Sequence, residues 1–194
     1  NVSGLIYNDD GAAAQYGIKV DYRQVIRRLV MQLIEDGARV LLVSHVLAPD
    51  GEIESDLGAA RLLRDSLPES VQSLVKVTPA GIDACQAKWI ISRLSWFSGT
   101  RMHSTIAGLS TGVPTSAIAY SDKTEPVFAT CGQDDHVADP RTSETDDVVD
   151  LLFNTWKNRA AIRADLAEHL PRVMELVKAQ VDSILEGAQR RLTT

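Results

Sequence analysis

The sequence is poor in cysteine, which excludes the usual zinc sites. Only two cysteines, Cys85 and Cys131, occur among the 194 residues, and their spacing matches no zinc-binding pattern. Two unpaired thiols fit the reducing cytosol, so we expect a cytoplasmic protein. A disulfide between them stays open at this level.

Long apolar runs, long basic runs and phosphate-binding glycine motifs are also missing. No stretch reaches the length of a membrane span, and no signal peptide is visible. The net charge of −6 and the isoelectric point near 5.2 argue against a general nucleic-acid binder. Gly11 and Gly17 are too loosely spaced for a dinucleotide fingerprint. No cluster of side chains suggests a bound metal, and we expect no cofactor.

The sequence does contain an alternation of short apolar runs and amphipathic segments. Val20–Asp36 has the spacing of an amphipathic helix, and Ala38–Ser44 is a continuous apolar run, typical of a parallel strand buried on both faces. The alternation predicts an α/β protein with a Rossmann-like, doubly wound, mostly parallel sheet of about six strands, followed by C-terminal helices. The predicted strands are Val2–Tyr7, Ala38–Ser44, Ser73–Val77, Leu94–Phe97, Thr115–Tyr120 and His136–Ala138.

The stretch Ser98–Lys123 predicts a turn, a helix and a strand in close succession. Gly99 allows a sharp turn after the preceding strand, and Thr100 is the expected N-cap of the helix. Arg101 and His103 then fall in the first helical turn, where the helix dipole is already positive. A guanidinium and an imidazole at this place favour a bound anion. The alternative is that both side chains point into water or pair with a nearby carboxylate.

The residues of this stretch resemble a known family signature. The run Gly99-Thr-Arg-Met-His-Ser, followed by Gly112-Val-Pro and Tyr120-Ser-Asp-Lys123, is similar to the signature of the polysaccharide pyruvyl transferases. Asn1-Val-Ser3 and Ser44-His45-Val extend the resemblance, which covers most of residues 1–140. Members of that family move the enolpyruvyl group of phosphoenolpyruvate onto sugar hydroxyls, commonly leaving a pyruvate ketal. They resemble glycosyltransferases of the GT-B fold, which have two Rossmann-like lobes, and this chain looks like the second lobe.

Several polar loops are expected to converge on the edge of the sheet where ligands of open α/β sheets bind. Arg101 is expected to bind the phosphate or the carboxylate of phosphoenolpyruvate, with Lys123 as a second charge. His103 is the candidate acid or base, and His45 is the second candidate, nearer the acceptor. The resemblance implies that Asp56 is a general base or orients His45, although aspartate is favoured in a first helical turn anyway. The remaining candidates for substrate binding are Thr100, Ser3 and Tyr120.

The resemblance also implies an organisation and a set of partners. We expect a donor-binding lobe over residues 1–140, and helices over residues 141–194 that pack on it or on a missing N-terminal lobe. The implied partners are phosphoenolpyruvate and a saccharide acceptor, free or lipid-linked. Two alternatives stay open. A GT-B glycosyltransferase would hold the diphosphate of a nucleotide sugar at the same helix start, and a non-catalytic lobe would only bind a sugar or an anion.

Overall fold

The strands form two small parallel sheets. The computed structural model describes residues 1–49 and 51–192, with side chains up to residue 188. In chain order the strands are β1 (Val40–Leu42), β2 (Val75–Val77), β3 (Phe97–Gly99), β4 (Thr115–Ile118) and β5 (Val137–Ala138). β1 pairs with β2, and β4 lies between β3 and β5. Every pair is parallel. The predicted parallel α/β class is confirmed, whereas about six strands in one sheet is wrong for the described residues.

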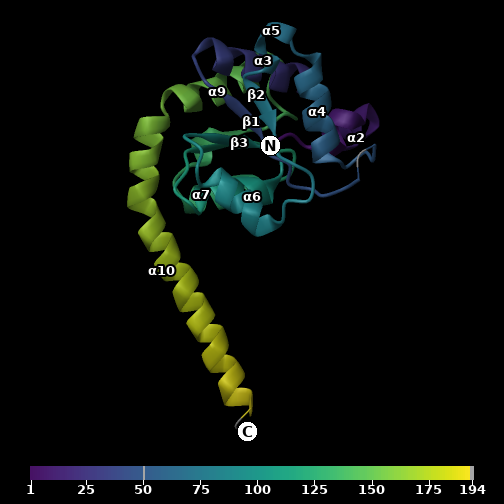
Figure 1. Ribbon diagram of the computed structural model, residues 1–194. Helices are drawn as coiled ribbons and strands as arrows, with labels where there is room; N and C mark the ends of the chain where they lie inside the picture. The colour runs from purple at the N-terminus through teal and green to yellow at the C-terminus, as the bar shows by residue number, and fades with distance from the viewer. Residues whose placement is uncertain (50, 193–194) are drawn as a thin grey trace.

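Helices cover the strands from both sides. Figure 1 shows α3 and α9 on one side of the strands, and α6 and α7 on the other. The helices are α1 (Gly4–Asn8), α2 (Asp10–Gln15), α3 (Tyr22–Glu35), α4 (Asp56–Ser66), α5 (Glu69–Gln72), α6 (Ala84–Ile91), α7 (Met102–Leu109), α8 (Thr124–Thr130), α9 (Thr145–Lys157) and α10 (Arg159–Leu192), with a 3₁₀ turn at Asp134–His136. The helix–sheet–helix layering is that of an α/β protein.

The first predicted strand, Val2–Tyr7, is wrong, because this segment turns into α1. Gly4 lies so close to the backbone of Ser55 that an added Cβ would sit 2.5 Å from its carbonyl atoms. Ile6 is buried in the main core. An apolar run this short has no periodicity that separates a strand from a helix. Asn8–Gly17, which reads as a loop in the sequence, likewise contains α2.

The main core lies between α3 and α9. Val25 and Leu29 of α3, and Val149 and Leu152 of α9, are at most 5% exposed. Burying one such side chain contributes about 1.5–3 kcal/mol. α3 in turn contacts β1 and α1.

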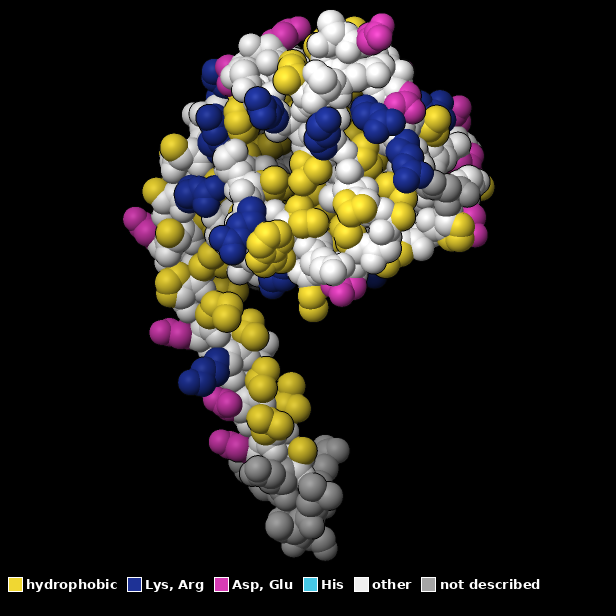
Figure 2. Space-filling view, in the orientation of Figure 1, with side chains coloured by type: hydrophobic (Ala, Val, Ile, Leu, Met, Phe, Trp, Pro, Cys, Tyr) yellow, Lys and Arg dark blue, Asp and Glu magenta, His cyan; other side chains and the backbone are white. Residues whose placement is uncertain are grey.

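The last helix, α10, leaves the body of the molecule. It continues past Pro171 without a break. Leu166, near its start, is fully buried, whereas Met174 and Ile184 are 60% and 70% exposed. Figures 1 and 2 show α10 extending away from the body with apolar side chains along it. Among the described residues, no helix combines the length and the apolar character needed to cross a membrane. The division near residue 140 stays a prediction, and residues 193 and 194 lie outside the described part.

Candidate functional site

A polar cluster lies at the carboxyl ends of β1 and β3, where the two sheets meet. His45 follows β1, and Arg101 follows β3. Asn1 joins the two ends. Its side-chain amide donates to the carbonyl oxygen of Val43 (3.0 Å), and its backbone nitrogen lies 2.6 Å from the carbonyl oxygen of Ser98. The predicted convergence of the loops after β1 and β3 on one edge is therefore confirmed.

Asp56, the first residue of α4, is the centre of this cluster. Its carboxylate is fully buried and accepts six hydrogen bonds of 2.9–3.2 Å. Oδ1 accepts from Gly4 N and from Nε and Nη2 of Arg101, and Oδ2 accepts from Asn1 Nδ2 and from the amides of His45 and Val46. Six donors on two oxygens fix the position of this carboxylate. These contacts favour an orienting role, and the role of general base stays a prediction.

Arg101 is paired with Asp56 in the cluster. Nε and Nη2 lie 3.2 and 3.1 Å from Oδ1, and the guanidinium side chain is only 12% exposed. Nη2 also donates to the carbonyl oxygen of Glu54 (3.3 Å). The sequence left open whether the Arg101 side chain binds an anion, points into water or pairs with a nearby carboxylate. The structure shows the pairing with a carboxylate. The hydrogen bonds of Arg101 to other described residues use Nε and Nη2, and none of them uses Nη1.

The predicted N-cap is wrong by one residue. Arg101 itself is the N-cap of α7, without a side-chain capping bond. The hydroxyl of Thr100 instead bonds to the hydroxyl of Tyr22 (2.7 Å), which also accepts from the amide of Ser3 (3.0 Å). Thr100 therefore serves the packing between β3 and α3. The Ser3 side chain is buried, and its hydroxyl has no partner among the described residues.

Tyr22 is a member of the cluster that the sequence did not single out. It begins α3 and is 4% exposed. Burial raises the pKa of its hydroxyl well above the ordinary value, so it stays protonated. The only signal in the sequence is an aromatic residue at the start of a helix, and this signal is equally typical of a core position.

The rings of His45 and His103 lie nearly parallel to each other. Their rings are 6.4 Å apart between centroids and tilted by only 9°. Burial lowers the pKa of His45, the negative charge of Asp56 opposes this in part, and His103 adds to the lowering. His45 is therefore neutral at pH 7. Its Nδ1 is buried without a hydrogen-bond partner in the described part of the chain, whereas His103 is exposed.

The contacts of the described residues do not join Tyr120 or Lys123 to this cluster. Tyr120 lies after β4, and its ring packs against Tyr16 with 5.0 Å between centroids. Lys123 is exposed at the start of α8, and its backbone nitrogen donates to Ser121 Oγ (3.4 Å). Their roles in substrate binding stay predictions.

The cluster offers donors for an anion. Arg101 lies at the N-cap of α7, and the amides of Met102 and His103 in the first turn point out of the helix start. The buried charge of Asp56 neutralises that of Arg101, so an incoming anion meets amide dipoles, one guanidinium edge and an exposed imidazole. Among the described residues, no group of three or more acidic, histidine or cysteine side chains is placed to hold a metal ion.

An α/β fold with a polar cluster at the carboxyl ends of its strands defines a class of ligand-binding enzymes and binding lobes. Comparison with known families makes the class specific. The chain belongs to the polysaccharide pyruvyl transferase family, whose model matches residues 5–122, more than half of the chain. That range holds the cluster from Asp56 to His103, and it ends one residue before Lys123. No curated protein and no solved structure matches the chain.

Proposed function

We propose that this chain carries the phosphoenolpyruvate-binding part of a polysaccharide pyruvyl transferase. Family membership supports a transferase that acts on polysaccharide. The observation that carries the proposal is Arg101, which Asp56 holds through Nε and Nη2 at the N-terminus of α7. Phosphoenolpyruvate has two anionic groups, and a guanidinium edge next to free amides suits either one.

The two histidines are proposed to serve the proton transfers. Ketal formation from phosphoenolpyruvate adds one proton at C3 and bonds C2 to two sugar hydroxyl oxygens, each of which loses its proton. The bond between C2 and the phosphate oxygen breaks, and phosphate leaves with the second proton. His45, kept neutral by burial, is proposed to accept a hydroxyl proton, and exposed His103 is proposed to donate or stabilise charge on the donor side. Asp56 positions both Arg101 and the backbone of His45. The same proposal includes a saccharide acceptor and an additional N-terminal lobe. It also includes Lys123 as a second positive charge for phosphoenolpyruvate.

Calorimetry tests the donor. The chain is titrated with phosphoenolpyruvate and, separately, with uridine diphosphate glucose. We expect only the first to bind, and Arg101→Lys to weaken it by at least about tenfold, because lysine keeps the charge but loses the planar fork. His169→Gln, which changes an exposed histidine on α10, is the matched control and should leave binding unchanged. Binding of the nucleotide sugar alone would favour a GT-B glycosyltransferase, and binding of neither compound would rule out a donor site.

Phosphate release tests the chemistry. With phosphoenolpyruvate and a saccharide acceptor, His103→Gln is expected to slow release by about 10²–10⁴-fold, which is the usual contribution of an acid or base. Donor affinity should stay near that of the unmodified chain. A variant that releases phosphate at the unmodified rate would remove His103 from the proposed mechanism.

A further inference from the structure

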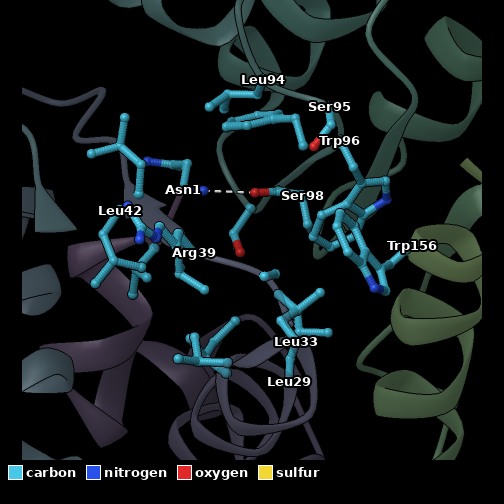
Figure 3. Close-up of a pocket in the computed structure, with 18 of the residues that line it drawn as sticks. Asn1, Leu29, Leu33, Arg39, Leu42, Leu94, Ser95, Trp96, Ser98 and Trp156 are labelled. Carbon is cyan, nitrogen blue, oxygen red and sulfur yellow. Dashed lines mark hydrogen bonds between the residues drawn. The ribbon is translucent and has the colours of Figure 1, made fainter. Parts of the chain in front are cut away.

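A groove separates the two sheets, and its walls are strand edges. β1 pairs only with β2 and β3 pairs only with β4 among the described strands, so each has one edge without a neighbouring strand. A cavity of about 330 Å³ lies between these two edges. In Figure 3, Arg39 and Leu42 stand on one side of it and Leu94, Trp96 and Ser98 on the other.

The backbone on both walls points hydrogen-bonding groups into the groove. Val40 N donates to Leu74 of the β2 side, and Phe97 N donates to Pro114 of the β4 side. Because successive residues of a strand face opposite neighbours, the polar backbone groups of Leu41 and Ser98 face the groove. The carbonyl oxygen of Ser98 is the one that lies 2.6 Å from Asn1 N. Each wall of the groove therefore offers a row of backbone N–H and C=O groups that could pair with another strand, as well as apolar surface.

Most of the remaining lining is apolar, with Asn1, Ser95 and Thr100 as polar exceptions. Leu29 and Leu33 of α3 form the floor in Figure 3, and Trp156 of α9 lies to one side. Figure 2 shows apolar side chains gathered on this face of the body, with lysine and arginine side chains around them. A pair of strand edges without neighbouring strands is a liability that proteins normally cover. Whatever fills the groove must form backbone hydrogen bonds with the strand edges on both sides and bury apolar side chains on both faces. A central β-strand has these properties.

We infer that the groove is the place of a sixth strand, formed by the segment of the same polypeptide that directly precedes Asn1, and that this strand joins the two sheets into one. Asn1 lies at the carboxyl end of the groove, bonded to both walls through Val43 and Ser98. A segment that runs through the groove and ends at Asn1 is parallel to β1 and β3. At about 3.3 Å per residue, about five residues fill it.

The resulting strand order supports this assignment independently. With the new strand between β1 and β3, the sheet reads β2, β1, new strand, β3, β4, β5. Numbered along the chain from the new strand, this order is 3-2-1-4-5-6, the order of the doubly wound dinucleotide-binding fold. The connection from the new strand through α3 to β1 is then a strand–helix–strand unit between adjacent parallel strands. The inference does not depend on the reaction proposed above.

Two experiments test the inference. The first reads the gene upstream of the codon for Asn1. We expect about five residues rich in Val, Ile or Leu without proline, because a strand buried on both faces needs apolar side chains and every backbone N–H. A proline or several charged residues at these positions, or no preceding codons, would overturn the assignment.

The second experiment fills the groove. The chain is extended before Asn1 by Val-Ile-Val-Ile-Val, and the matched control carries Val-Pro-Val-Pro-Val, which lacks two ladder donors. We expect hydrogen exchange to slow at least about tenfold in both segments 39–43 and 95–99 of the first variant and in neither segment of the control. Protection of one wall only, or equal protection by both extensions, would refute a central strand. Concentration-dependent protection of the unextended chain would assign the groove to a second copy and equally overturn the inference.

Discussion

Replacing Asp56 by asparagine tests the electrostatic centre of the site. The change keeps the size and shape of the side chain and removes its charge. Three donors face Oδ1 and three face Oδ2. Whichever way the new amide turns, its NH₂ group replaces one carboxylate oxygen. The three donors that faced that oxygen then have no acceptor. Arg101 also loses the carboxylate that neutralises it, although its side chain is only 12% exposed.

The expected cost follows from this arrangement. Removing one partner of a buried ion pair destabilises a protein by about 3–5 kcal/mol, mainly because the other charge is left buried without compensation. A domain of ordinary stability has about 5–15 kcal/mol in all. With a urea dependence of about 2 kcal/mol per molar, the midpoint of unfolding should fall by about 2 M. Circular dichroism during urea titration measures this midpoint.

The same helix supplies the control. Asp65 of α4 pairs with Arg64, but both side chains are exposed, at 59% and 38%. Asp65→Asn should therefore cost less than about 1 kcal/mol. In the Asp56→Asn background, Arg101→Met should cost less than it does in the unmodified chain, because the guanidinium has already lost its partner. If Asp56→Asn costs no more than Asp65→Asn, the carboxylate is not the centre that its contacts indicate.

Three further changes test other residues of the cluster and of the fold around it. Tyr22→Phe leaves a buried amide without its acceptor, so the free energy of unfolding should fall by about 1–3 kcal/mol in the same titration. Gly4→Ala places a Cβ against backbone and should cost about 1–3 kcal/mol, whereas Gly187→Ala meets nothing within 4 Å and should cost nothing. Burial lowers the pKa of His45 and His136 in the folded chain, so the unfolded chain binds these protons more readily. Stability should be full above pH 6.5, about the pKa of an unfolded histidine, and fall below it. Replacing both histidines by asparagine should flatten the fall between pH 7 and 5, and an unchanged slope would contradict the burial argument.

Local chemistry made several elements predictable. The helix Asp56–Ser66 has local signals at both ends, because Ser55 caps its start and the leucine before Pro68 is forced out of the helical region. The helix after β3 was predicted from the turn at Gly99, and Gly112 and Pro114 follow its end at Leu109. These signals act within a few residues of the element that they delimit, so one sequence suffices to read them.

The contacts that define the site could not be predicted in this way. Asp56 and Arg101 are 45 positions apart, and Tyr22 and Thr100 are 78 apart. Each pair forms only because the sheets place the strand ends together. The resemblance selected Asp56 and Arg101 but could not say that they bind each other. The number of strands in one sheet also depends on distant edges, and the expected strand at Val2–Tyr7 is replaced by α1.

Asn1 connects the groove between the sheets to the polar cluster. Its backbone meets Ser98 at the end of one wall, and its side chain meets Val43 at the end of the other. The same side chain donates to Asp56 and accepts from the amide of Arg101 (3.1 Å). In a doubly wound sheet, ligands bind where the strand order reverses, which here is the boundary between the groove and β3. A strand in the groove would hold Asn1 rigidly from its amino side, so Arg101 and Asp56 should become better ordered without any change to their own residues.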